Sequence, residues 1–103
     1  MAVIKWTLQA ADDLESIADF ISLDSPHYAS LFVLDVISAV ERLERFPELG
    51  RRVPEADKST IRELLLGNYR VIYLNQNDVV EVLTIYHGAR LLDPKKLPQY
   101  GED

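Results

Sequence analysis

The sequence contains no cysteine, which excludes a disulfide framework and any zinc site built on thiolates. It also lacks a long apolar run. Its longest nearly uncharged stretch, residues 64–77, is interrupted by Arg70, so we expect no membrane-spanning segment. The first residues lack the apolar stretch of a signal peptide. These absences together predict a cytoplasmic protein.

Histidine and glycine are scarce, which removes several classes of site. The two histidines, His27 and His87, are far apart and match no metal-binding spacing, so we predict no metal ion and no cofactor. No glycine-rich phosphate loop is present, which excludes nucleotide hydrolysis by a P-loop or Rossmann route. The strained serine turn of α/β-hydrolases is also missing.

An excess of basic charge is lacking as well. The net charge is −6, which argues against broad binding to a phosphate backbone. Residues 1–48 carry nine acidic and three basic side chains, whereas residues 49–103 carry eight of each. Five of the eight basic residues in the second half are arginines. The length of 103 residues predicts one domain, residues 1–103, with an irregular tail from about residue 91.

The first half of the chain predicts a short strand followed by two helices. Residues 2–6 are typical of a strand, and Thr7 is placed to N-cap a helix over about residues 8–22. Ser25-Pro26 is a strong start signal for a second helix, which Pro47 should end. Two adjacent helices with a short link form a helical hairpin.

The second half predicts a loop over residues 47–59 and then three strands. The strands are separated by turn-forming residues, and they cover residues 61–66, 69–74 and 79–86. Alternation along the last strand places His87 on one face with Leu83 and Ile85. The predicted fold is therefore α+β with the order β-α-α-β-β-β. We expect the N-terminal helical hairpin to pack on one face of a mainly antiparallel four-stranded sheet.

Polar residues on this sheet are the candidates for chemistry. Arg70 lies inside an apolar strand and shares a face with Ile72 and Leu74 by alternation. Arg62 opens the preceding strand, and His87 follows the last one. We expect these side chains to converge on the sheet face without helices. Arginine binds two phosphate oxygens through its guanidinium group, and histidine transfers protons near neutral pH.

The same residues also have a purely structural interpretation. A strand arginine is often paired with a carboxylate, and Glu63 and Glu81 are available to Arg70 across the ladder. A histidine at the end of a strand is usually solvated or bonded to the backbone. The pattern by itself leaves both interpretations open.

Several short segments follow one another in a recognisable order. They are Trp6-Thr7, Ala10, Asp13-Leu14, Ile17, Phe20-Ile21, Phe46 to Arg51, Ile61 to Leu64, Tyr69 to Tyr73 and His87 to Arg90. In this order, from about residue 3 to residue 92, the chain resembles the RelE/ParE superfamily of type II toxin–antitoxin toxins. The fold of that superfamily agrees with the predicted one. The resemblance implies a growth-inhibiting toxin that a small antitoxin protein neutralises.

The resemblance implies two possible mechanisms. RelE-like toxins cleave mRNA on the ribosome, where basic side chains stabilise charge and move protons. ParE-like toxins poison DNA gyrase and keep no ribonuclease site. For a ribonuclease, the resemblance makes Arg70 and Arg90 catalytic clamps on the phosphate, His87 the catalytic acid–base group and Arg62 a substrate-binding residue.

Some positions depart from the ribonuclease pattern. Ile61 and Glu63 occupy the strand where RelE itself has catalytic lysines, and no tyrosine follows Arg90 at the expected distance. Because arginines stay charged, His87 is the residue left to titrate. We favour a RelE-like ribonuclease as the first hypothesis. The alternatives are a gyrase inhibitor without enzymatic activity and a non-toxic relative that only forms complexes. In each case we expect the antitoxin to bind along the helical hairpin and the sheet edge.

Overall fold

The computed structural model describes residues 1–56 and 60–88. The predictions for Arg90 and for an irregular tail lie outside these residues. The elements, in chain order, are β1 (Val3–Trp6), α1 (Leu8–Ser22), α2 (Pro26–Glu41), the 3-10 helix η1 (Arg42–Glu44), β2 (Arg51–Arg52), β3 (Ile61–Leu66), β4 (Tyr69–Gln76) and β5 (Val79–His87). None of the helices in residues 1–56 and 60–88 combines the length and the hydrophobicity that a transmembrane span requires.

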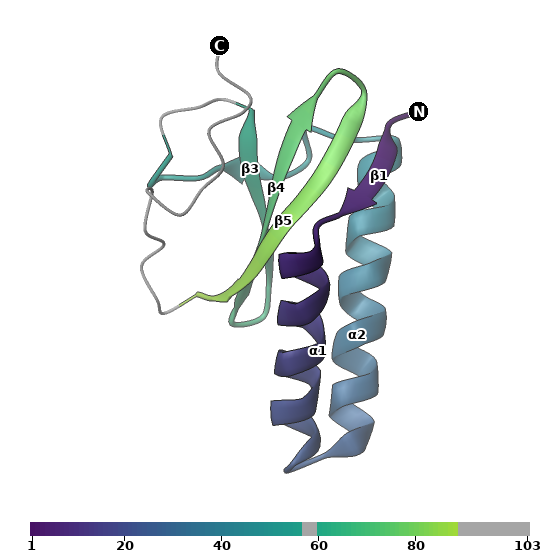
Figure 1. The fold of residues 1–103 in the computed structure, drawn as a ribbon, viewed down its shortest axis with the longest axis vertical. Coiled ribbons are helices and arrows are strands. Elements are labelled where there is room, and N and C mark those ends of the chain that lie inside the picture. Colours follow the sequence, from purple (N-terminus) through teal and green to yellow (C-terminus); the bar gives the residue numbers. More distant parts are fainter. Residues whose placement is uncertain (57–59, 89–103) are drawn as a thin grey trace.

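The strands form one mixed sheet in the order β1-β5-β4-β3-β2. The edge strand β1 is parallel to β5, and the other neighbouring pairs are antiparallel. Figure 1 shows α1 and α2 side by side as a hairpin, with the turn between them at the opposite end of the molecule from the β4–β5 turn. The predicted α+β fold with an N-terminal helical hairpin is therefore confirmed.

The predicted number of strands is too low, because the sheet formed by residues 1–56 and 60–88 has five strands and not four. The additional strand, β2, lies inside the predicted loop of residues 47–59. It consists of Arg51, opposite Glu63, and Arg52, opposite Arg62. Two residues are too few for alternation to reveal a strand, so only the register with β3 defines it.

Capping side chains explain where the two helices start. The Thr7 hydroxyl accepts a hydrogen bond from the Ala10 amide at 3.0 Å, and the Ser25 hydroxyl accepts one from the Tyr28 amide at 3.2 Å. Pro26 occupies the first position of α2. Both predicted starts and the predicted range of the first helix, 8–22, are confirmed.

A β-bulge in β5 changes which side chains share a face. Ile72 pairs with Thr84 and Tyr73 with Val82, so Leu83 has no partner in the register. Leu83 then packs in the same cluster as Ile72. The prediction that His87 shares a face with both Leu83 and Ile85 is therefore wrong, because one inserted residue reverses the alternation.

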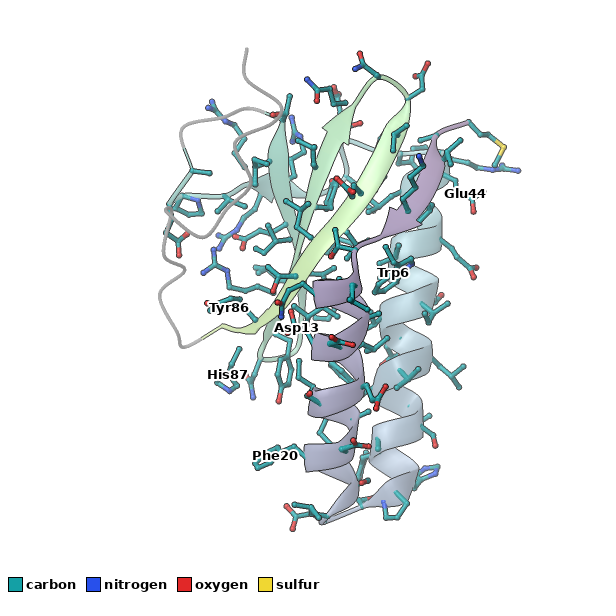
Figure 2. The ribbon with its side chains drawn as sticks, viewed as in Figure 1. Trp6, Asp13, Phe20, Glu44, Tyr86 and His87 are labelled. Carbon is teal, nitrogen blue, oxygen red and sulfur yellow. The ribbon has the colours of Figure 1, made fainter. Side chains whose placement is uncertain are left out.

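Side chains of α1 and of its N-cap form hydrogen bonds with β5 at the bulge. The Asp13 carboxylate accepts hydrogen bonds from the Thr84 hydroxyl at 2.5 Å and the Ile85 amide at 3.0 Å, and Figure 2 shows Asp13 beside β5. The Thr7 hydroxyl donates to the carbonyl of Leu83 at 2.9 Å. The backbone groups freed by the bulge are satisfied in this way, which fixes α1 against the sheet.

Apolar side chains are buried on both faces of the sheet. On the helical face, Val71 and Val82 pack with Val36 and Val40 of α2. On the other face, Ile72 packs with four more buried residues, which are Val53, Ile61, Leu74 and Leu83. The sequence predicts that this face carries no helices, and in the structure Val53, from the segment after β2, packs on part of it.

Candidate functional site

Arg70 lies at one end of this second face and is held by two carboxylates. Its Nε donates to Glu63 Oε1 at 2.5 Å, and its two terminal nitrogens donate to the two oxygens of Glu55 at 2.8 Å each. The Arg70 side chain is only 8% exposed and that of Glu55 17%. Strand β4 therefore supplies the arginine, while the segment after β2 supplies the carboxylate that covers it.

Glu63 joins Arg70 to a second arginine. Its side chain is fully buried, and its other oxygen accepts a hydrogen bond from Nε of Arg51 at 2.6 Å. Arg51 is Glu63's partner in the β2–β3 register. We call this group of residues the charge network, and its members are Arg51, Glu55, Glu63 and Arg70. It holds two positive and two negative charges, so its formal charge is zero.

The two carboxylates of the charge network stabilise the charged form of Arg70 inside the protein. Hydrogen bonding to Glu55 raises the pKa of Arg70, against the lowering caused by burial, and the bond to Glu63 adds to the increase. A fully charged arginine is thus matched by its own carboxylates. A phosphate group that approached it would meet those negative charges first.

His87 lies at the exposed end of β5 (Figure 2). In the strand register it is directly opposite Tyr69. The two rings meet edge to face with their centroids 5.3 Å apart. The next pair along the ladder is Tyr86 with Arg70. Successive side chains of a strand point to opposite faces of the sheet. His87 pairs with Tyr69, the neighbour of Arg70, so the side chains of His87 and Arg70 leave the sheet on opposite faces.

The structure nevertheless brings two of the predicted residues to one place. Arg70 and His87 both line an open pocket at the end of the β3–β4 hairpin, with Glu55 also in its wall. Arg62 does not line it. Arg62 donates to the carbonyl of Gly50 at 2.8 Å, so it supports a loop on the other side of β2.

The predicted site residues thus have different surroundings, and their proposed roles in catalysis stay predictions. Arg90 lies outside the described residues. Glu63 is one of the two partners that the structural interpretation offers for Arg70. The sequence does not identify Glu55 and Arg51 as site residues. Nothing in the predicted loop of residues 47–59 indicates that this segment folds back over a strand. Among the residues that the structure describes, no group of three or more acidic or histidine side chains is placed to hold a metal ion.

Comparison with known proteins decides the family. The family model described as the ParE toxin of the type II toxin–antitoxin system parDE matches residues 4–92. The chain belongs to the ParE toxin family. It is therefore the toxin component of a type II toxin–antitoxin system, as the resemblance in the sequence predicts.

Individual relatives of the toxin agree with this assignment. Toxin RelE2 of Caulobacter vibrioides is 35% identical over 92 residues, which cover 88% of this chain and all of the relative. Protein Y4kP of Sinorhizobium fredii is 40% identical over 87 residues, covering 82% of this chain and 86% of the relative. A solved structure described as the chromosomal ParDE system of P. aeruginosa matches with a TM-score of 0.69. That match has 27% identity and covers 84% of this chain and 96% of the other.

Proposed function

We propose that this toxin stops growth by binding a protein target, DNA gyrase, and not by cleaving mRNA. The observation that carries the proposal is the pairing of Arg70. Each of its three nitrogens donates to a carboxylate of the chain itself, either Glu63 or Glu55. A ribonuclease of the RelE type needs this arginine available to a phosphate, whereas a binding protein does not.

The surroundings of the other predicted residues support the same proposal. Arg62 is engaged with the backbone of the loop before β2 and is not among the residues that line the pocket with Arg70. His87 packs edge to face against Tyr69. A general acid–base group must also lie within hydrogen-bonding reach of the phosphate that Arg70 would hold. Here the charge of Arg70 is already neutralised by Glu63 and Glu55.

Substitution of His87 separates the two mechanisms. His87 is exposed, so His87→Ala leaves the core intact. We expect wild-type and His87→Ala toxins, expressed without an antitoxin, to arrest growth equally and to produce no new mRNA 5′ ends. Arrest that needs His87 and is accompanied by codon-periodic cleavage would support the ribonuclease hypothesis instead. Expression without any growth phenotype would favour a non-toxic relative.

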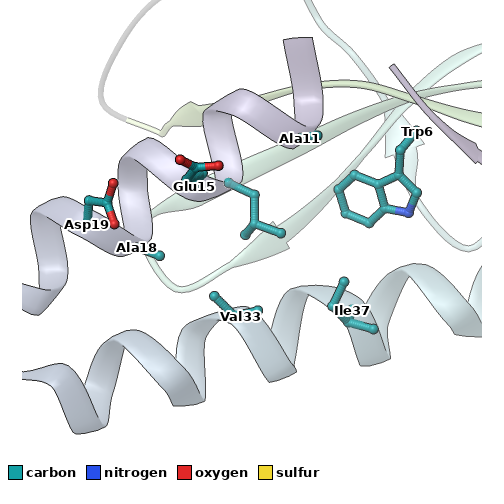
Figure 3. Close-up of a pocket in the computed structure, with 8 residues that line it drawn as sticks. Trp6, Ala11, Glu15, Ala18, Asp19, Val33 and Ile37 are labelled. Carbon is teal, nitrogen blue, oxygen red and sulfur yellow. The ribbon is translucent and has the colours of Figure 1, made fainter. Parts of the chain in front are cut away.

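We also propose that an antitoxin helix binds the groove between α1 and α2. Figure 3 shows Val33 and Ile37 of α2 pointing toward α1, with Trp6 at one end. The carboxylates of Glu15 and Asp19 flank this apolar groove. An amphipathic helix with basic residues at its margin fits that pattern. The related P. aeruginosa structure is described as a ParDE system, which supports an antitoxin as the partner.

Charge reversal on the groove margin tests this second proposal. The double substitution Glu15→Lys/Asp19→Lys should weaken antitoxin binding in titration calorimetry, because it removes the charge complementarity. The matched control is Glu41→Lys, which changes an exposed carboxylate at the end of α2 outside the groove. Equal affinities for all three proteins would contradict the assignment of the groove.

A further inference from the structure

A loop at one end of the molecule is held by groups that lie deeper in the fold. This loop, residues 46–50, connects η1 to β2. Tyr73 of β4 is fully buried, and its hydroxyl donates to the carbonyl of Pro47 at 2.8 Å and accepts from the amide of Gly50 at 2.9 Å. Arg62 of β3 donates to the carbonyl of Gly50. Two core strands thus fix the backbone of one short surface loop.

Gly50 shows how closely the loop fits against the sheet. A Cβ atom at this position would lie 2.6 Å from the carbonyl oxygen of Glu63 and 2.7 Å from the hydroxyl of Tyr73. Both distances are far below van der Waals contact, so only glycine allows the approach. The position of the loop is therefore set by the strands beneath it.

This fixed loop presents two large apolar side chains to solvent. Phe46 is 61% exposed and Leu49 is 52% exposed. Exposed apolar side chains forgo the stabilisation that burial would give them. When they stand on a rigid backbone, they can instead bind a partner without a large ordering cost, which is typical of hot spots in protein interfaces.

The loop faces a second structural element across an open pocket. The opposite wall is the β4–β5 turn, where Asn77 and Asp78 have positive φ angles of 55° and 60°. The end of β4 and this turn supply three residues with amide side chains to the pocket lining, which are Asn75, Gln76 and Asn77. Amides both donate and accept hydrogen bonds, so they complement the peptide groups of an extended protein segment.

The charges around the pocket favour protein over nucleic acid. Its charged lining residues are Arg45, Glu48 and Asp78, which give a formal charge of −1. A surface with this charge offers a phosphate backbone no net attraction, whereas the binding of a neutral protein segment does not need one. The chemistry that fits is therefore an extended stretch of protein with a large apolar side chain for the pocket.

We propose that the loop 46–50 and the β4–β5 turn form the surface through which the toxin binds its cellular target. The ligand is an extended, neutral segment of the target protein with one large apolar side chain. This inference rests on the proposed function, in which the toxin acts by binding a protein. The surface shares no residue with the groove between α1 and α2, so antitoxin and target would have separate sites.

The double substitution Phe46→Ser/Leu49→Ser tests the surface directly. We expect about a 30-fold or greater increase in the toxin concentration that half-inhibits gyrase supercoiling, because two interface anchors are lost. The growth arrest should weaken in parallel. Thermal unfolding and antitoxin affinity should match those of the wild-type toxin. The matched control is Leu8→Ser, which changes a side chain that is 78% exposed and lies in neither pocket.

A second variant tests the role of rigidity. Tyr73→Phe keeps both apolar side chains and removes the hydroxyl that fixes the loop. We expect a loss of inhibition smaller than that of the double variant and larger than that of Leu8→Ser, in protein that circular dichroism shows to be folded. Inhibition by Tyr73→Phe equal to that of wild type would overturn the contribution of the fixed backbone.

Several results would overturn the assignment of the surface. A folded double variant that inhibits supercoiling as well as the wild type would remove it as the target site. Parallel loss of antitoxin binding would assign the surface to the antitoxin, and loss of a toxin dimer would assign it to a second copy. Cleavage of mRNA by the wild-type toxin would contradict the proposed function itself. That result does not depend on the surface variants, so the two failures can be told apart.

Discussion

The two segments on either side of β2 are held to the same sheet by different means. The loop before it, residues 46–50, is tied by its backbone and leaves its large apolar side chains outside. The segment after it buries Val53 in the core and sends the carboxylate of Glu55 to Arg70. The first segment is thus built to present side chains, and the second to cover the sheet and neutralise a cation.

Arginines on a sheet therefore need not form an anion site. All three nitrogens of the Arg70 guanidinium donate to carboxylates, and Nη1 of Arg62 donates to the carbonyl of Gly50. Both arginines then serve the architecture around β2. The apolar loop beside them is the better candidate for recognition, because its exposed side chains contribute little to the core.

The largest expected effect comes from removing the cation of the charge network. Arg70→Ala should lower the free energy of unfolding by about 3–5 kcal/mol, because it leaves the buried Glu63 with only the exposed Arg51 to balance its charge and removes two hydrogen bonds from Glu55. Urea unfolding measures the change. Replacing the pair by apolar residues, Arg70→Met/Glu63→Leu, should recover part of the loss. A cost below about 1 kcal/mol for Arg70→Ala would contradict the structural role.

A smaller effect is expected on the other side of β2. Tyr73→Phe should lower the free energy of unfolding by about 1–3 kcal/mol, because the carbonyl of Pro47 and the amide of Gly50 lose their buried partner. Urea unfolding at neutral pH measures it. The control Tyr28→Phe changes a residue that is 66% exposed and should have little effect. Equal stability of the two variants would show that the loop does not depend on the buried hydroxyl.

The same hydroxyl predicts a dependence of stability on pH. Burial raises the pKa of Tyr73 above its ordinary value of 10.0, because the phenolate is disfavoured inside the protein. The folded state therefore keeps the proton longer than the unfolded state does. The stability difference between wild type and Tyr73→Phe should be constant below pH 10 and should shrink as the pH rises further. A difference that stays constant up to pH 12 would contradict this assignment.

The smallest expected effect is at the exposed end of the charge network. Arg51 is 58% exposed, although it bonds to the buried Glu63. Arg51→Ala should cost no more than about 1 kcal/mol, because solvent screens the pair and Arg70 still neutralises Glu63. The free energies of unfolding of Arg51→Ala and Arg70→Ala should be measured under the same urea conditions. Similar costs for the two variants would mean that both arginines carry the network equally.

Local signals in the sequence predict most of the fold. Capping residues and apolar spacing define α1 to the residue, and turn-forming residues separate β3, β4 and β5. The bulge at Leu83 was missed, since one inserted residue leaves the apolar pattern nearly unchanged. Strand β2 was missed because its two residues carry no pattern of their own.

The candidate site could be predicted only in part. Alternation finds Arg70 on the face away from the helices and offers Glu63 as a partner. It does not find Glu55, which is fifteen positions away along the chain in a loop. The exposed loop at Phe46 appears in the sequence only as part of a family pattern. Its significance depends on the hydroxyl of Tyr73, a contact between residues 26 positions apart.

Inhibition of gyrase by the toxin can be tested directly in a DNA supercoiling assay with purified gyrase and purified toxin. We expect wild-type and His87→Ala toxins to inhibit supercoiling equally, and Phe46→Ser/Leu49→Ser to inhibit it much more weakly. No inhibition by the wild-type toxin, together with His87-dependent cleavage of mRNA, would contradict binding to gyrase as the mechanism of the toxin.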